Sequence, residues 1–210
     1  FGMAMAFWSS LGQTFFISLF SGQIRQTLNI SHGDFGTYYA IATTASALSL
    51  IWLGKLADTI RLETLAMFVL GSLCCSAILF SQVSSLWILV GGLYLLRMFG
   101  QGMMTHVYTT AMARRYVSTR GRAISIAQLG QTFSESIGPA SIVALLALFD
   151  WRSLWIGLPI IAFCMLAPFL RYLTQRTRLQ DGEGREGLTS NQTWPEKAFA
   201  SQRQWRRSEV

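Results

Sequence analysis

Charge is what this sequence has little of, and long stretches of it carry none. Asp, Glu, Lys and Arg together make up 13% of the 210 residues, whereas an average soluble domain carries about 25%. The stretches 1–24, 35–54 and 153–170 contain no charged residue, and 123–149 contains only Glu135. Each stretch is close to the length of about 20 residues that a helix needs to cross the hydrocarbon core of a bilayer. The sequence therefore excludes an ordinary soluble domain and predicts an all-α membrane protein.

Six transmembrane helices account for these apolar stretches. We place them at 2–22, 35–54, 65–82, 86–111, 123–148 and 154–173. The first stretch lacks the basic start and the small-residue cleavage site of a signal peptide. Because the chain opens inside an apolar run and without Met, we expect its native start to lie further upstream.

Cysteine is also rare, and all three cysteines fall inside predicted spans. They are Cys74, Cys75 and Cys164. An odd number with two adjacent members argues against a disulfide framework. We therefore interpret them as small packing residues.

Basic residues are concentrated in the connections on one side of the predicted spans. Those on one side follow the second, fourth and sixth spans and are Lys55, Arg61, Arg114, Arg115, Arg120, Arg122, Arg171, Arg176 and Arg178. The connections on the other side hold only Arg25 and Arg152. Since cytoplasmic loops are enriched in Lys and Arg, we expect a multi-pass protein with both termini in the cytoplasm, in a bacterial inner membrane or a plasma membrane. The same rule explains the net charge of +7 without nucleic acid as a partner.

The character of the sequence changes near its end. Residues 1–175 form the expected six-helix transmembrane bundle, whereas 176–210 are polar and charged. We interpret 176–210 as a polar cytoplasmic linker rather than a second folded domain.

The fourth predicted span carries Arg97, the only charged residue between 65 and 113. An arginine at the centre of a membrane helix costs about 2.5–3.5 kcal/mol on insertion scales, so its side chain should not face lipid. At about 100° per residue, Arg97 shares a face about 80° wide with four other residues. These are Tyr94, Gln101, Thr105 and Tyr108. His106 projects from the opposite side, and we interpret it as a packed, hydrogen-bonded residue.

The fifth predicted span has two adjoining faces of different character. The polar face, about 60° wide, consists of Gln128, Gln131 and Glu135. The stripe of small residues, four positions apart, consists of Gly130, Ser134 and Gly138. Small residues at this spacing let helix backbones approach closely. Pro139 should bend the helix or free backbone groups.

The remaining spans are polar to different degrees. The first contains Gln13, and the second contains Tyr39 and several hydroxyl residues, whereas the apolar centres of the third and sixth contain no charge, Asn or Gln. Spans one, two, four and five can therefore line an aqueous interior, with three and six toward lipid. The predicted substrate pathway consists of Gln13, Tyr94, Arg97, Gln101, Gln128, Gln131 and Glu135. The alternative is that these polar residues only hold helices together, at about 0.6 kcal/mol apiece.

Four short motifs occur at the ends and centres of these spans. They are GKLADTIR at 54–61, RMFGQG at 97–102, RGRA at 120–123 and GP at 138–139. Their order, spacing and sidedness resemble the N-terminal six-helix half of the major facilitator superfamily. The first is similar to the G-x-L-a-D loop of that family, the second to its R-x-x-q-G-x-g motif, and the last to the start of its G-P-x-x-G-G motif.

The resemblance implies an architecture and a mechanism. Two six-helix halves enclose a substrate site near the midplane of the membrane and rock around it. The chain would supply one half, 176–210 would begin the central loop, and a second six-helix half is the expected partner. Members of the family are secondary carriers that need no cofactor. A gate on the cytoplasmic side, implied by the same resemblance, consists of Gly54, Asp58, Arg61 and Arg114.

These observations together predict a secondary active transporter of a small solute. The planar guanidinium of Arg97 suits a carboxylate or phosphate, so it can pair with an anionic substrate, such as a monocarboxylate, or with Glu135. A carboxylate that binds a proton on one side of the membrane and releases it on the other can couple proton movement to transport. We assign that role to Glu135 as a hypothesis.

Two other classes of protein stay open as alternatives. A membrane-embedded enzyme needs a nucleophile with a base, or metal ligands on facing helices. The sequence has no G-x-S-x-G or H-E-x-x-H motif and only two histidines, His32 and His106, so we predict no catalytic and no metal site. The second class is a channel or a non-transporting scaffold or receptor. Channels tend to show a filter loop or rings of charged residues, neither of which is visible in the sequence. A scaffold or receptor would not need Arg97 and Glu135 in matching polar faces. Saturable counterflow distinguishes a carrier from both.

Overall fold

A computed structural model describes residues 1–55 and 60–191, with side chains to Arg171. Residues Phe1–Leu170 form one compact unit, and a second unit starts at Arg171. All regular secondary structure in the described residues is helical, which confirms the all-α prediction. Asp58 of the predicted gate lies outside the described residues.

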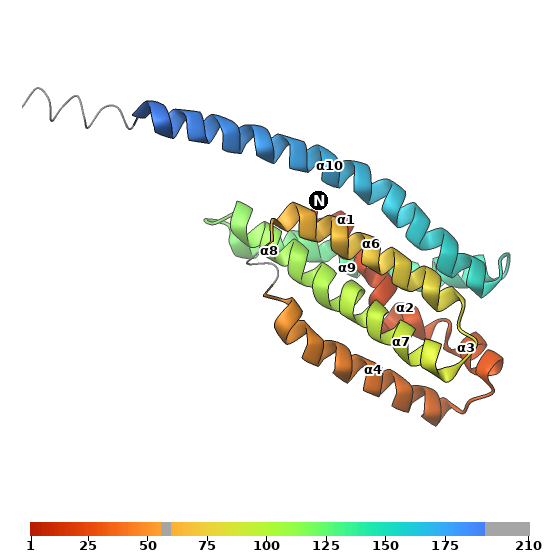
Figure 1. Cartoon of the computed structure of the whole chain (residues 1–210). Coiled ribbons are helices and arrows are strands. Elements are labelled where there is room, and N and C mark those ends of the chain that lie inside the picture. The colour runs from red at the N-terminus through yellow and green to blue at the C-terminus, as the bar shows by residue number, and fades with distance from the viewer. Residues whose placement is uncertain (56–59, 192–210) are drawn as a thin grey trace, which may run out of the picture. The chain divides into compact units, whose positions relative to one another are not determined.

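Each of the six predicted spans corresponds to one helical stretch of the chain (Figure 1). The first is divided into α1 (Gly2–Trp8), η1 (Ser9–Gly12), α2 (Thr14–Ser18) and α3 (Ser21–Leu28). The second and third are α4 (His32–Leu53) and α6 (Leu62–Ser81). The fourth is divided into α7 (Leu86–Leu96), η2 (Arg97–Met104) and α8 (Thr105–Arg115). The last two are α9 (Arg120–Leu146) and α10 (Trp151–Asn191).

Length and hydropathy separate these helices into two groups. Among the described residues, three stretches are long and apolar enough to cross a membrane, namely Leu62–Ser81, Leu86–Arg115 and Trp151–Arg171. The bent pair Gly2–Ser18 and Ser21–Leu28, with 63° between its parts, makes a fourth if it counts as one span. Helices α4 and α9, of 22 and 27 residues, are also long enough to cross. They are less apolar because both carry many polar side chains.

The first span is not the continuous helix 2–22 that the sequence predicts. Its 3₁₀ segment η1 ends at Gly12, and Gln13 has extended backbone angles of φ −84° and ψ 153°. A new helix starts at Thr14. The first span therefore has a break within its predicted length, and the Gly12 carbonyl at the break has no place in a regular helix ladder.

The fourth span also differs from prediction, because η2 is a π-helix of eight residues. A π-helix bonds residue i to i+5, not i+4, so it changes the direction in which the following side chains point. The polar face calculated for a regular α-helix therefore does not hold across Arg97–Met104. Such segments are rare and occur often at functional sites.

Two local features fix the ends of helices in the bundle. Ser31 and Asp34 form a capping box at the start of α4, in which the Ser31 hydroxyl accepts from the Asp34 amide and the Asp34 carboxylate accepts from the Ser31 amide, both at 3.1 Å. Asn29 just before it adopts the left-handed conformation with φ 53°, which ends α3.

An aromatic cluster joins the first, third and sixth spans. The Trp155 ring of α10 lies 4.8 Å from Phe80 of α6, 5.1 Å from Phe20 and 5.4 Å from Phe16 of α2, measured between ring centroids. All four side chains are buried. Aromatic pairs at these distances contribute about 0.5–1.5 kcal/mol beyond the burial of their area. This cluster holds the two least polar spans, α6 and α10, against the broken first span.

Candidate functional site

Arg97 is the centre of the candidate site, and its side chain is only 7% exposed. It is the first residue of the π-helix η2. Its Nη1 donates to the Thr14 hydroxyl at 3.0 Å and to the Gly12 carbonyl at 3.4 Å. The guanidinium also lies over the Tyr39 ring, 5.4 Å from the ring centroid. The charge is therefore placed against the break in the first span and is buried within the chain.

The break lies this close to Arg97 because two glycines meet there. A Cβ atom on Gly12 would lie 2.7 Å from the Gly100 Cα and still closer to the Leu96 carbonyl oxygen. A Cβ atom on Gly100 would lie 2.6 Å from the Gly12 Cα. The backbones of η1 and η2 are thus in direct contact, and a side chain at either position would push them apart.

Thr14 joins three spans in one hydrogen-bonded group. Its hydroxyl accepts from the Tyr39 hydroxyl of α4 at 2.8 Å as well as from Arg97. Its own hydroxyl proton is therefore free to donate to a ligand. The Thr14 side chain is exposed, whereas Arg97 beside it is buried. An anion that approaches Thr14 would meet donors from the first, second and fourth spans.

One donor of Arg97 has no partner among the described residues. Its Nε is buried and makes no hydrogen bond to any of them. A buried donor left unsatisfied costs about 1–3 kcal/mol, and more when the group is charged. The edge of the guanidinium that carries Nε is one of those that bind a carboxylate through two parallel hydrogen bonds.

The other predicted residues of this face have separate neighbours. Tyr94 is half-buried and donates to the Ser49 hydroxyl of α4 at 2.8 Å, and α4 and α7 run side by side (Figure 1). Gln101 is exposed, and Gln13 in the break is buried. Tyr94 and Arg97, which were calculated to share one helical face, thus bond different neighbours, and the π-helix changes the direction of the residues that follow Arg97.

The polar face of α9 forms a ladder of amides that ends at a carboxylate. The Tyr108 hydroxyl donates to Gln128 at 3.1 Å, Gln128 donates to Gln131 at 3.4 Å, and Gln131 donates to Glu135 at 2.8 Å. The side chains of Gln128 and Glu135 are exposed. These residues therefore form one continuous hydrogen-bonded row along the helix.

Arg97 and Glu135 have different partners in this structure. Arg97 bonds the first span, whereas Glu135 accepts from Gln131 on its own helix. Arg61 and Glu63 form an ion pair at 3.7 Å. The ion pair of Arg97 with Glu135, which the sequence offered as one way to satisfy the arginine, is not formed here.

The predicted gate residues lie at the ends of α4, α6 and α8. Gly54 is the C-terminal cap of α4, and its carbonyl oxygen lies 3.2 Å from His106 Nε2. Arg61 caps the start of α6, and its side chain is exposed. Arg114 is exposed in the last turn of α8.

The small-residue stripe of α9 lies against the first span. A Cβ atom on Gly130 would lie 2.7 Å from the Met3 carbonyl carbon and nearer still to its oxygen. Ser134 is buried, and a Cβ atom on Gly138 would meet the Phe15 ring at 3.6 Å. Pro139 lies inside α9, which continues past it to Leu146. The small residues thus allow the closest backbone contact between α1 and α9 at Gly130.

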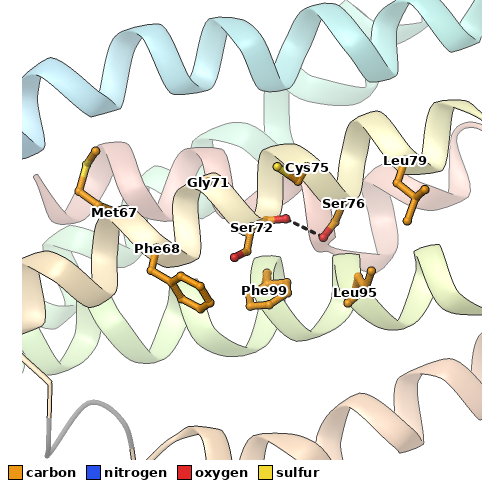
Figure 2. A pocket seen from close by; sticks show the side chains of 9 residues that line it. All are labelled: Met67, Phe68, Gly71, Ser72, Cys75, Ser76, Leu79, Leu95 and Phe99. Atoms are coloured by element: carbon orange, nitrogen blue, oxygen red, sulfur yellow. Dashed lines mark hydrogen bonds between the residues drawn. The ribbon is translucent and has the colours of Figure 1, made fainter.

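A groove of about 480 Å³ lies between α6 and the fourth span (Figure 2), and neither Arg97 nor its hydrogen-bond partners line it. Seven residues of α6, together with Leu95 and Phe99, line it, and none of them is charged. Its Ser76 hydroxyl donates to the Ser72 carbonyl at 2.6 Å. The groove therefore offers an ion no charged partner. In the described residues, no three His, Cys, Asp or Glu side chains gather as a metal site would require.

Sequence reasoning passed over Thr14 and gave Tyr39 only a minor place. No sequence pattern singles out Thr14, because its importance depends on the helix break beside it. Tyr39 belongs to the weakly polar second span. The polar face calculated for the fourth span concerns that helix alone, so it cannot show that Tyr39 lies against Arg97.

Comparison with known proteins identifies the family but no individual relative. No curated protein matches the chain. The model of the Major Facilitator Superfamily matches residues 2–209, nearly the whole sequence. This family consists of membrane transporters, which are not enzymes as a class. The chain is therefore a multi-pass integral membrane protein that belongs to the Major Facilitator Superfamily.

Proposed function

We propose that this chain is the N-terminal half of a secondary carrier that moves a small organic anion across the membrane by alternating access. The observation that carries the proposal is the buried Arg97 guanidinium, whose Nε has no partner among the described residues. A group that costs this much to bury is retained when a ligand satisfies it in part of the cycle. A second six-helix half, on the same native chain or on another, completes the cavity.

The charge of the site favours a monoanion. Arg97 is the only charged residue between 65 and 113, and Thr14 and Tyr39 beside it are neutral. One carboxylate neutralises one guanidinium, whereas a dianion would leave a net charge in a medium of low dielectric constant. We therefore propose a monocarboxylate as the substrate class, bound through the Nε edge of Arg97 and the free proton of the Thr14 hydroxyl.

Glu135 is proposed as the group that carries a coupling proton. It is exposed at the end of the α9 ladder, where Gln131 orients one of its oxygens. The remaining substrate-pathway residues, Gln13, Tyr94, Gln101 and Gln128, line the same route in this proposal. Both termini are placed in the cytoplasm, which puts Gly54, Asp58, Arg61 and Arg114 at a cytoplasmic gate.

Uptake of labelled lactate by the full native carrier in proteoliposomes tests the role of Arg97. Removal of one partner from a buried charged contact with a ligand costs about 2–5 kcal/mol. At about 1.4 kcal/mol per tenfold, Arg97→Gln should lower uptake at subsaturating lactate at least 30-fold. Arg25→Gln, a matched change in α3 away from the site, should leave uptake within about twofold. Saturable uptake that is unchanged in Arg97→Gln would refute the proposal.

A proton gradient tests Glu135 separately. With an imposed pH difference, the wild-type carrier should accumulate lactate against its gradient, and Glu135→Gln should only equilibrate it. Counterflow, which needs no net proton movement, should survive in Glu135→Gln. If this variant still accumulates lactate as the wild type does, Glu135 is not the coupling group.

A further inference from the structure

His106 makes a contact that its sequence position does not suggest. It lies in α8, half-buried, and its Nε2 is 3.2 Å from the carbonyl oxygen of Gly54. The two residues are 52 positions apart in the sequence and belong to different spans. The contact therefore ties the end of the second span to the second half of the fourth.

The carbonyl group that His106 contacts is one that has no hydrogen-bond partner within its own helix. Gly54 caps α4, and the last carbonyls of a helix have no partner within it. The chain leaves α4 at this peptide and enters the connection that leads to Arg61 and α6. A bond to this carbonyl thus fixes the point from which the connection starts.

The direction of the hydrogen bond follows from the chemistry of the two groups. A carbonyl oxygen can only accept, so Nε2 carries the proton and donates it. Both the neutral Nε2–H tautomer and the doubly protonated ring can do this. Either of these forms of the ring can therefore make the hydrogen bond to the Gly54 carbonyl oxygen.

The same helical stretch carries His106 and Arg97. Helix α8 follows η2 without interruption, and His106 is nine residues after Arg97 in the same helical stretch. A movement of the fourth span at Arg97 is therefore passed to His106 and, through its ring, to the Gly54 peptide. The π-helix between them sets the rotation that brings His106 to α4.

We propose that His106 is a positioning residue, which couples the ligand site at Arg97 to the end of α4 through the Gly54 carbonyl. The inference rests on the proposed function only for its effect on transport, because cleavage beside the end of α4 can be measured without a substrate. His106 touches no ligand in this proposal and acts through the backbone of Gly54.

Trypsin cleavage beside the end of α4 and the start of α6 tests this link. Lys55 and Arg61 are both exposed and lie at the two ends of the connection. In the detergent-solubilised full native protein, His106→Leu should raise the rate of cleavage at these residues about fivefold. His106→Gln, whose side-chain amide can still donate, should restore most of the protection. His32→Leu, a matched change of the exposed histidine at the start of α4, should have no effect.

Transport gives the second readout. In proteoliposomes with labelled lactate, His106→Leu should lower the maximal rate about tenfold and change KM less than twofold, with rescue by His106→Gln. Equal cleavage of wild type and His106→Leu would overturn the inference, as would a loss of affinity without a loss of maximal rate. If the wild type does not transport lactate but the cleavage pattern holds, the proposed substrate falls and the positioning role of His106 stands.

Discussion

Replacement of Gly130 by alanine is the sharpest test of how this bundle packs. The Cβ atom that Gly130→Ala introduces would lie 2.7 Å from the Met3 carbonyl carbon and 2.9 Å from the Met3 Cα. Real Cβ atoms essentially never come this close to other heavy atoms. Because the obstacle is main chain, it cannot rotate away as the end of a flexible side chain would. Helices α1 and α9 must therefore separate at this point.

The expected loss of stability follows from two opposing effects. Overpacking of a tight contact costs typically 1–3 kcal/mol and occasionally more, and a rigid backbone obstacle favours the upper part of this range. Because alanine favours a helix more than glycine does, the same substitution also stabilises the helix by about 1 kcal/mol. The net loss should be about 2 kcal/mol, which lowers the midpoint of thermal unfolding by about 4–8 °C in a protein of 150–250 residues and by less in a larger one.

Gly138 on the same helix is the matched control. A Cβ atom there would meet Phe15 at 3.6 Å and the Ser134 hydroxyl at 3.8 Å, both ordinary van der Waals distances. Gly138→Ala should therefore change stability by less than about 1 kcal/mol. Thermal unfolding of the solubilised native protein, followed by tryptophan fluorescence, measures both variants. Equal midpoints for the two variants would refute the close contact between α1 and α9.

Two further predictions concern residues outside the site. Arg152 donates to the Ser81 carbonyl at 2.5 Å and to the Val83 carbonyl at 2.9 Å. A hydrogen bond from a charged group contributes about 1.5–3 kcal/mol. Arg152→Met should therefore lower the free energy of unfolding by about 2–4 kcal/mol, and Arg152→Lys should lower it by less. An unfolding midpoint that is unchanged in Arg152→Met would disprove this. Hydrogen bonds from the hydroxyl and amide of Ser31 lower the pKa of Asp34, which precedes the predicted span 35–54. A lowered folded pKa means that this stabilisation is full above the ordinary Asp pKa of about 3.9 and is lost as the pH falls through the folded value. Unfolding midpoints between pH 6 and pH 3 should therefore fall more steeply for the wild type than for Asp34→Asn, and parallel curves would contradict the role of the cap.

The sequence by itself determined the class of the protein. A bilayer leaves unpaired backbone groups no water to bond, so apolar stretches of about 20 residues must become helices wherever they lie. That rule needs no knowledge of neighbouring helices, and it identified the six helical stretches from charge and length alone. The cost of a charge inside the membrane likewise singled out Arg97 before any contact was known.

Tertiary structure alone decided what Arg97 touches. The polar face calculated for the fourth span assumes the same rotation at every residue. The π-helix from Arg97 to Met104 does not follow that rotation. The break at Gln13 brings Gly12 against Gly100, 88 residues away, and a contact at that separation cannot be read from the first span alone.

The hydrogen bond between His106 and the Gly54 carbonyl likewise could not be predicted from the sequence. A lone histidine on an apolar helix is compatible with any neighbour, and the open carbonyl that it meets belongs to another span. Apolar length is a property of one segment and can be read along the chain. The partner of a buried polar group depends on how two segments pack, and that is decided only when the helices meet.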